Sequence, residues 1–193
     1  MEFNVEEVNK IIRHRRSIFP VCYTGEVISD EIVNQILENA TWAPSHKLTQ
    51  PWKFKVFTGK GLETLGDFQS NMYKKLATAD FDQKKFDKLK EKPLKCSHVI
   101  AIGMNRNELV PEIEEVEAVA CGVQNMALTA SAYKLGSYWG TGGITYKEEA
   151  KEFFGLGEND KLLGFFFLGV PSIEWPNRAV RKPVGEKVSW VRD

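Results

Sequence analysis

Residues 112–135 form the longest periodic stretch of the chain, and they limit its fold more than any other feature. Small apolar residues recur along this stretch at helical spacing: Val116, Ala120, Val123, Ala127 and Ala130. A helix of this length would be roughly 36 Å long. Because small side chains let another backbone approach closely, we expect the central helix of the fold here, packed against a partner subunit.

Shorter patterns on both sides of this stretch predict a mixture of helices and strands. Apolar stripes predict helices over 5–16, 29–41 and 146–154, with Asn4 and Ser29 as N-caps of the first two. Strand-like runs are at 53–58, 97–103, 136–139 and 161–170. The lysine-rich segment 62–94 is predicted to be a solvated, mobile helical flap.

Charge and length exclude several classes of protein. The chain has 26 Lys and Arg against 26 Asp and Glu, so nothing drives binding to nucleic acid or to an anionic membrane surface. A length of 193 residues suits one core, and we expect a single domain over 1–193. The longest apolar run, 162–170, is about half of the roughly 20 residues that span a bilayer.

The cysteines, histidines and N-terminus indicate a cytoplasmic protein without a metal. The N-terminus lacks a secretory signal pattern. Cys22, Cys96 and Cys121 form no CxxC pair, and the three histidines are isolated, so neither a disulfide framework nor a metal site is expected. The chain also lacks the GxGxxG, GxxxxGK[ST], GxSxG and HExxH motifs.

Three remaining features could carry chemistry, and each has a structural alternative. Arg15-Arg16-Ser17 could bind a phosphate, or the two arginines could simply interact with a helix C-terminus. The loop 42–52, with two Trp and two Pro, could bind a ligand or only pack its aromatic rings. The Gly140–Gly143 turn could approach a planar ligand or be only a tight connection.

Together and in this order, these features resemble the nitroreductase family of FMN-dependent oxidoreductases, in particular its short single-domain bacterial members. The resemblance covers nearly the whole chain, and its specificity lies in the order and spacing of the motifs. The matching segments are Arg15-Arg16-Ser17, Trp42-Ala43-Pro44-Ser45-His46-Lys47, Gln50-Pro51-Trp52-Lys53-Phe54, 120–126, 136–143, 155–157, 161–169 and Arg181-Lys182-Pro183.

The resemblance implies an α+β fold, a mixed and mainly antiparallel sheet flanked by helices, assembled as a homodimer with FMN at the interface. Arg15, Arg16, Ser17 and Arg181 would hold the FMN phosphate and ribityl chain. Trp42 and His46 of the opposite subunit would line the cofactor, and Trp139, Gly140, Thr141 and Gly142 would lie against its ring system. No catalytic acid or nucleophile is implied, and no metal.

The implied activity transfers electrons from NAD(P)H through FMN to a small acceptor, nitroaromatic or quinone-like, in a ping-pong cycle. Lys47 is a candidate for a positive charge near the flavin, but a solvated loop lysine is the favoured interpretation. Two alternatives stay open. One is a flavin-destroying or dehalogenating enzyme of the same fold, and the other is a flavin-binding protein without turnover.

Overall fold

The fold is built on one four-stranded sheet. The computed structural model describes residues 2–77, 80–177 and 179–192. Its strands are β1 (Trp52–Thr58), β2 (His98–Met104), β3 (Gly136–Gly140) and β4 (Lys161–Gly169), in the spatial order β1-β2-β4-β3. All three pairings are antiparallel, and one isolated parallel bridge joins Ser17 to Ser137. The predicted mixed, mainly antiparallel sheet flanked by helices is confirmed.

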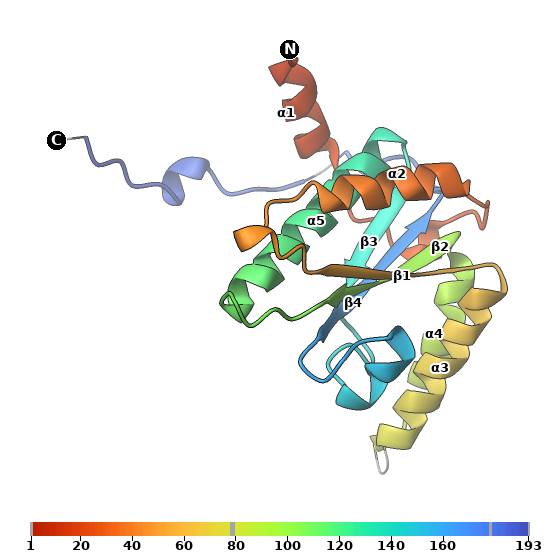
Figure 1. Cartoon of the computed structure of the whole chain (residues 1–193). Coiled ribbons are helices and arrows are strands. Elements are labelled where there is room, and N and C mark those ends of the chain that lie inside the picture. Colours follow the sequence, from red (N-terminus) through yellow and green to blue (C-terminus); the bar gives the residue numbers. More distant parts are fainter. Residues whose placement is uncertain (1, 78–79, 178, 193) are drawn as a thin grey trace.

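Helices α2 (Asp30–Thr41) and α5 (Glu112–Ala132) cover one face of the sheet (Figure 1). Alternate residues of the two central strands point to this face, as a strand repeat of two requires, and Ile100, Ile102 and Phe166 are almost completely buried there. The sequence predicted both helices within a few residues of their observed ends.

Helix α3 (Lys60–Ala77) covers the other face of the sheet, and α4 (Gln83–Glu91) packs against α3. Leu65 of α3 is fully buried beside Phe165 and Phe167 of β4, and the ring of Phe68 stacks on Phe153 at 3.7 Å between centroids. The predicted flap is therefore helical, but α3 is part of the core rather than a solvated surface element. Its mobility stays a prediction, and residues 78 and 79 lie outside the described residues.

The small residues of α5 pack within the same chain. Val123, Ala127 and Ala130 are buried together with Ile36 and Ala40 of α2. At Gly122 an added Cβ would lie 3.0 Å from the carbonyl oxygen of Ala40, so the two helix backbones are in close contact. Three of the five seam residues are therefore covered within the chain, whereas Val116 and Ala120 are half-buried, and packing of this seam against a partner subunit stays a prediction.

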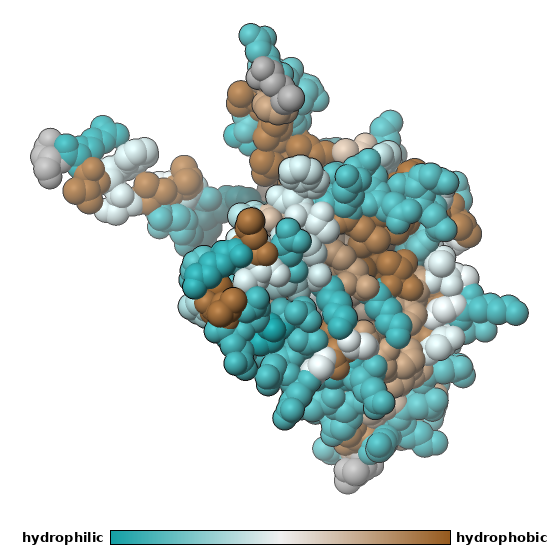
Figure 2. Space-filling view, viewed as in Figure 1, coloured by the Kyte–Doolittle hydropathy of each residue, from teal (hydrophilic) through white to brown (hydrophobic). Residues whose placement is uncertain are grey.

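The two ends of the chain project from this body (Figure 1). Helix α1 (Val5–His14) begins at Asn4, whose side chain accepts hydrogen bonds from the backbone N–H groups of Glu6 and Glu7 at 2.9 and 3.3 Å, as predicted for an N-cap. No residue of α1 is buried. Figure 2 shows apolar side chains exposed on α1 and along the C-terminal segment.

The predicted helix over 146–154 is wrong. The chain forms two short 3₁₀ turns instead, η5 (Glu148–Ala150) and η6 (Glu152–Phe154), whose backbone bonds join residues three apart. Tertiary packing explains the difference, because Phe153 stacks on Phe68 while the neighbouring Phe154 is buried against Phe165. In the described part of the chain, no helix combines the length and apolar character needed to cross a membrane.

Replacing Gly66 tests the contact between α3 and α4. A Cβ at Gly66 would lie 2.3 Å from the carbonyl oxygen of Lys90, whereas at Gly61 of the same helix nothing lies closer than 3.9 Å. We expect Gly66→Ala to destabilise the protein by about 1–3 kcal/mol, despite the better helix propensity of alanine. The control Gly61→Ala should be neutral or stabilising by up to about 1 kcal/mol. Urea unfolding measures both, and equal effects would contradict this packing.

Candidate functional site

Two groups of candidate residues lie along the edge strand β3. Ser17 forms the parallel bridge with Ser137, and the backbone N–H of Ile18 donates to the Ser137 carbonyl at 2.9 Å. Trp139 and Gly140 follow on the same strand, about 7–10 Å further along at 3.4 Å per residue. The fold therefore brings the Arg15–Ser17 triplet and the glycine turn to one edge of the sheet.

Arg16 lies just after α1 and partly caps the end of that helix. Its Nη1 donates to the carbonyl oxygens of Arg13 and Arg15 at 2.6 and 2.9 Å. Its Nε is buried and has no hydrogen-bond partner in the described part of the chain. A buried N–H group without a partner is costly, so this guanidinium can still bind an anion. Arg15 is half-buried and Ser17 exposed, with no side-chain hydrogen bond among the described residues.

A β-bulge fixes the side chain of Trp139. Ile102 of β2 faces Gly164 and Gly103 faces Leu162, so Leu163 of β4 is the extra residue. Its carbonyl oxygen accepts a hydrogen bond from the Trp139 Nε1 at 3.1 Å. Gly164 has φ +124°, and a Cβ there would lie 2.6 Å from the Gly140 carbonyl oxygen, so only glycine fits. The bulge thus determines where the indole lies.

The turn after β3 leaves backbone accessible. Thr141 and Gly142 are exposed, and a Cβ at Gly142 would meet no atom within 4 Å. Gly143 has φ +74°, and Thr145 donates its hydroxyl to the Gly142 carbonyl at 3.1 Å, which closes the turn. Backbone N–H groups in such an open turn can approach a planar ligand closely.

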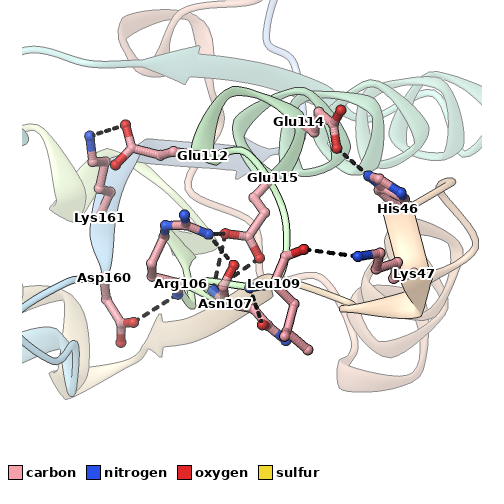
Figure 3. Close-up of polar contacts among 10 residues, drawn as sticks. All are labelled: His46, Lys47, Arg106, Asn107, Leu109, Glu112, Glu114, Glu115, Asp160 and Lys161. Carbon is pink, nitrogen blue, oxygen red and sulfur yellow. Dashed lines mark hydrogen bonds and ion pairs between the residues drawn. The ribbon is translucent and has the colours of Figure 1, made fainter.

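The loop from Trp42 to Pro51 carries the other candidates, at the opposite edge of the sheet. Trp42 is 80% exposed, and the His46 Nδ1 contacts the Glu114 carboxylate of α5. Lys47 donates its Nζ to the Leu109 carbonyl at 3.1 Å (Figure 3). Lys47, Leu48 and Gln50 all have φ near +50°, a conformation that is strained in residues other than glycine and that often occurs at functional sites.

One chain alone does not bring all the candidates together. The antiparallel pairings put the start of β1, which follows this loop, and the end of β3 at the same end of the sheet, but on opposite edges. Two strands lie between them, so these edges are about 14 Å apart. Arg181 lies in the projecting C-terminal segment, where its Nη1 donates to the Val180 carbonyl. Trp42, His46 and Arg181 are therefore apart from Trp139 within this chain.

A buried ion pair at the end of β2 escaped the sequence analysis. Arg106 donates to the Glu115 carboxylate at 2.7 Å, and both carboxylate oxygens accept from the Asn107 N–H at 3.1 Å (Figure 3). The Glu115 side chain is 1% exposed and that of Arg106 is 17% exposed. Asp160 accepts from the Arg106 backbone N–H at 2.9 Å. The sequence signal that could have revealed this pair is the position of the Glu115 carboxylate on the apolar face of α5.

A second acidic residue of α5 is paired at the surface. Glu112 accepts from the Lys161 Nζ at 2.6 Å, and this hydrogen bond lowers the pKa of Glu112 below its usual value. The two side chains are 47% and 42% exposed. The same helix end thus offers one exposed ion pair for comparison with the buried one. Within residues 2–77, 80–177 and 179–192, no three His, Cys, Asp or Glu residues gather as a metal site would require.

Glu115→Ala should destabilise the protein by about 3–5 kcal/mol, because it leaves the Arg106 guanidinium without its carboxylate in a buried environment. The matched control, Glu112→Ala, removes a half-exposed pair and should change the stability far less than Glu115→Ala does. Urea unfolding followed by circular dichroism measures both. A similar small loss for both variants would show that Glu115 contributes no more than a surface charge.

Comparisons with known proteins agree with the family resemblance of the sequence. The model of the Nitroreductase family matches residues 12–170. A relative from Escherichia coli (strain K12), the candidate NAD(P)H nitroreductase YdjA, is 32% identical over 146 residues, which are 75% of this chain and 78% of the relative.

Solved structures share the fold over almost the full length. The nitroreductase-like family protein from Bacillus cereus has a TM-score of 0.81 and 25% identity, covering 99% of this chain and 98% of that protein. A candidate nitroreductase from Desulfovibrio desulfuricans, solved in complex with FMN, has a TM-score of 0.70 and 26% identity, covering 100% and 99%.

Proposed function

The chain belongs to the Nitroreductase family, and from this premise we propose that it is an FMN-dependent oxidoreductase. It takes electrons from NAD(P)H and passes them to a small acceptor, nitroaromatic or quinone-like, in a ping-pong cycle. The FMN bound to the related Desulfovibrio protein and the name of the Escherichia coli relative support this assignment. We further propose that residues 1–193 form a single domain of this kind.

The bridge between Ser17 and Ser137 is the observation that carries the proposal. It holds the Arg15–Ser17 triplet at the start of the strand that ends in Trp139 and Gly140, so one edge of the sheet offers a phosphate-binding end and a ring-binding end. The buried Arg16 Nε without a partner fits an anionic group. Arg15, Arg16 and Ser17 would bind the FMN phosphate and ribityl chain through charge-assisted hydrogen bonds.

The ring-binding end comprises Trp139, Gly140, Thr141 and Gly142. The hydrogen bond from Trp139 to Leu163 keeps the indole in one orientation, and the open turn leaves backbone N–H groups free to donate to the edge of a planar ring. FMN bound here would supply the hydride chemistry. The protein would orient the ring, leave one face open to substrates and stabilise negative charge at the ring edge.

We propose that the rest of the site comes from a second copy of the chain. Trp42, His46 and Arg181 are apart from Trp139 within one chain, so a homodimer could complete the site by bringing them from the partner subunit. Lys47 lies beside His46, but its ammonium already donates to the Leu109 carbonyl. Lys47 is therefore a weaker candidate for the positive charge at the flavin.

The projecting ends of the chain support this homodimer. On α1, Val5, Val8 and Ile12 form an apolar stripe that is 48–69% exposed. In the C-terminal segment, Val180 and Trp190 are 89% and 76% exposed. Apolar residues arranged along projecting segments are typical of surfaces that a partner covers. A dimer that covers both segments should bury about 2,000 Å² or more, as obligate homodimers do.

The purified protein tests the proposed activity. It should be yellow, release FMN on acid treatment and oxidise NADH or NADPH in the presence of a quinone or nitroaromatic acceptor. A flavoprotein without turnover would instead indicate a storage or sensing role. A colourless protein that takes up no added FMN would contradict the assignment.

Arg16→Ala should weaken FMN binding by about ten- to a hundredfold, which corresponds to one lost charge-assisted contact. The control is Lys10→Ala, because the Lys10 ammonium on α1, the helix that Arg16 follows, is already paired with Glu7 at 2.9 Å. Its FMN affinity should change by less than about twofold. Fluorescence titration with FMN measures both variants, and equal affinity of Arg16→Ala and wild type would refute the phosphate assignment.

Replacing Val8 and Ile12 together by Asp should separate the proposed dimer, because it puts charges into the apolar stripe of α1. The monomer fold should survive, since no residue of α1 is buried. Val27→Asp is the control, because Val27 is 75% exposed but lies outside both projecting segments. Sedimentation of both variants tests this prediction, and a double variant that still sediments as the wild type would rule out α1 as part of the interface.

A further inference from the structure

A groove lies between α4 and the turn that follows the Arg15–Ser17 triplet. It has a volume of about 670 Å³, and Phe19, Pro20, Val21 and Tyr138 line it opposite the lysine-bearing side of α4. This volume is within the range of about 300–1,000 Å³ that is typical of small-molecule sites. None of its lining residues is among the candidate flavin-binding residues.

The floor of the groove is aromatic and accessible. The rings of Phe19 and Tyr138 lie 4.6 Å apart between centroids with an interplanar angle of 48°. Phe19 is 52% exposed and Val21 is 72% exposed. A flat apolar molecule can therefore pack on this floor without displacing core residues.

The wall of the groove is positively charged. Lys84, Lys88 and Lys92 follow one another at intervals of four residues, which places them on one side of a helix, and Lys95 lies just beyond. Two carboxylates also line the groove, Asp87 and Glu91, and Asp87 already accepts from the Gln83 amide at 2.7 Å. In the described part of the chain, none of these four lysines forms an ion pair with a carboxylate.

Lys92 is the unusual member of this set. It is half-buried, and its Nζ lies 3.8 Å from the ring centroid of Phe167 and 5.1 Å from that of Tyr138. Burial lowers the pKa of Lys92 below its usual value, because the charged ammonium loses hydration. The faces of the Phe167 and Tyr138 rings attract the ammonium and offset part of the lost hydration, but a bound anion would offset more of it.

We propose that this groove binds a small aromatic anion, whose ring packs on Phe19 and Tyr138 and whose acidic group pairs with Lys92 and Lys88. The aromatic floor selects a planar apolar body, and the unpaired lysines select negative charge. An aromatic carboxylate, sulfonate or phosphate combines both features at this size. The inference concerns a site apart from the proposed flavin site and does not depend on it.

Anilinonaphthalene sulfonate is a suitable probe, with its neutral parent phenylnaphthylamine as the matched ligand. Calorimetric titration is done on the full-length protein with and without saturating FMN. We expect one strong site for the sulfonate in both cases. Lys92→Met keeps most of the side-chain volume but removes the charge, and it should weaken sulfonate binding about tenfold or more while changing binding of the neutral parent by less than about twofold.

Lys85→Met is the control variant. Lys85 is also on α4 and its Nζ lies 4.6 Å from the ring of Tyr73, but it does not line the groove, so sulfonate binding should be unchanged. If Lys92→Met fails to fold, the exposed Lys88→Glu serves instead, since charge reversal at the wall should weaken sulfonate binding severalfold. Equal affinity in wild type and these groove variants would overturn the proposal. Loss of the site on adding FMN would also overturn it, because the probe would then occupy the flavin site.

Discussion

The parallel bridge between Ser17 and Ser137 is the contact on which the proposed site depends. It forms because Gly136 has no side chain, since a Cβ there would lie 2.7 Å from the Tyr23 ring and 3.1 Å from Ile18. Tyr23 donates its hydroxyl to the Ile18 carbonyl at 2.7 Å and so secures the segment after the triplet. A backbone contact at one edge strand thus sets the distance between the arginines and the glycine turn.

The two proposed sites are neighbours along the chain, because the groove residues Phe19, Pro20 and Val21 follow the Arg15–Ser17 triplet, but the sites differ in the residues they need. The flavin site needs residues from both ends of β3 and, we propose, Trp42, His46 and Arg181 of a second copy. The groove is complete within one chain, because α4 lies against the turn at Pro20 and the ring of Tyr138. Leu89 of α4 also approaches Gly143, where an added Cβ would lie 3.0 Å from it, so the groove wall and the glycine turn are close neighbours.

Local patterns predicted most of the fold. Apolar repeats identified α2, α5 and the four strands, and Asn4 was identified as an N-cap from its position alone. Features that depend on distant contacts were missed. Contacts within the chain bury Val123, Ala127 and Ala130 of the α5 seam together with α2. The segment at 148–154 forms 3₁₀ turns because Phe153 and Phe154 pack on different elements. Glu115 pairs with Arg106 across a loop. The family resemblance suggested the candidate residues and assigned Trp42 and His46 to the opposite subunit, and the strand order places the loop that carries them at the other edge of the sheet from Trp139.

Sedimentation velocity of the wild-type protein, recorded at the flavin and the protein absorbance together, tests the central claim most directly. The claim is that two chains complete one flavin site between the edge strand of one subunit and Trp42, His46 and Arg181 of the other. The account predicts that both signals move together at the rate of a dimer, and that dissociation on dilution releases FMN. Flavin that sediments with a monomer would contradict it.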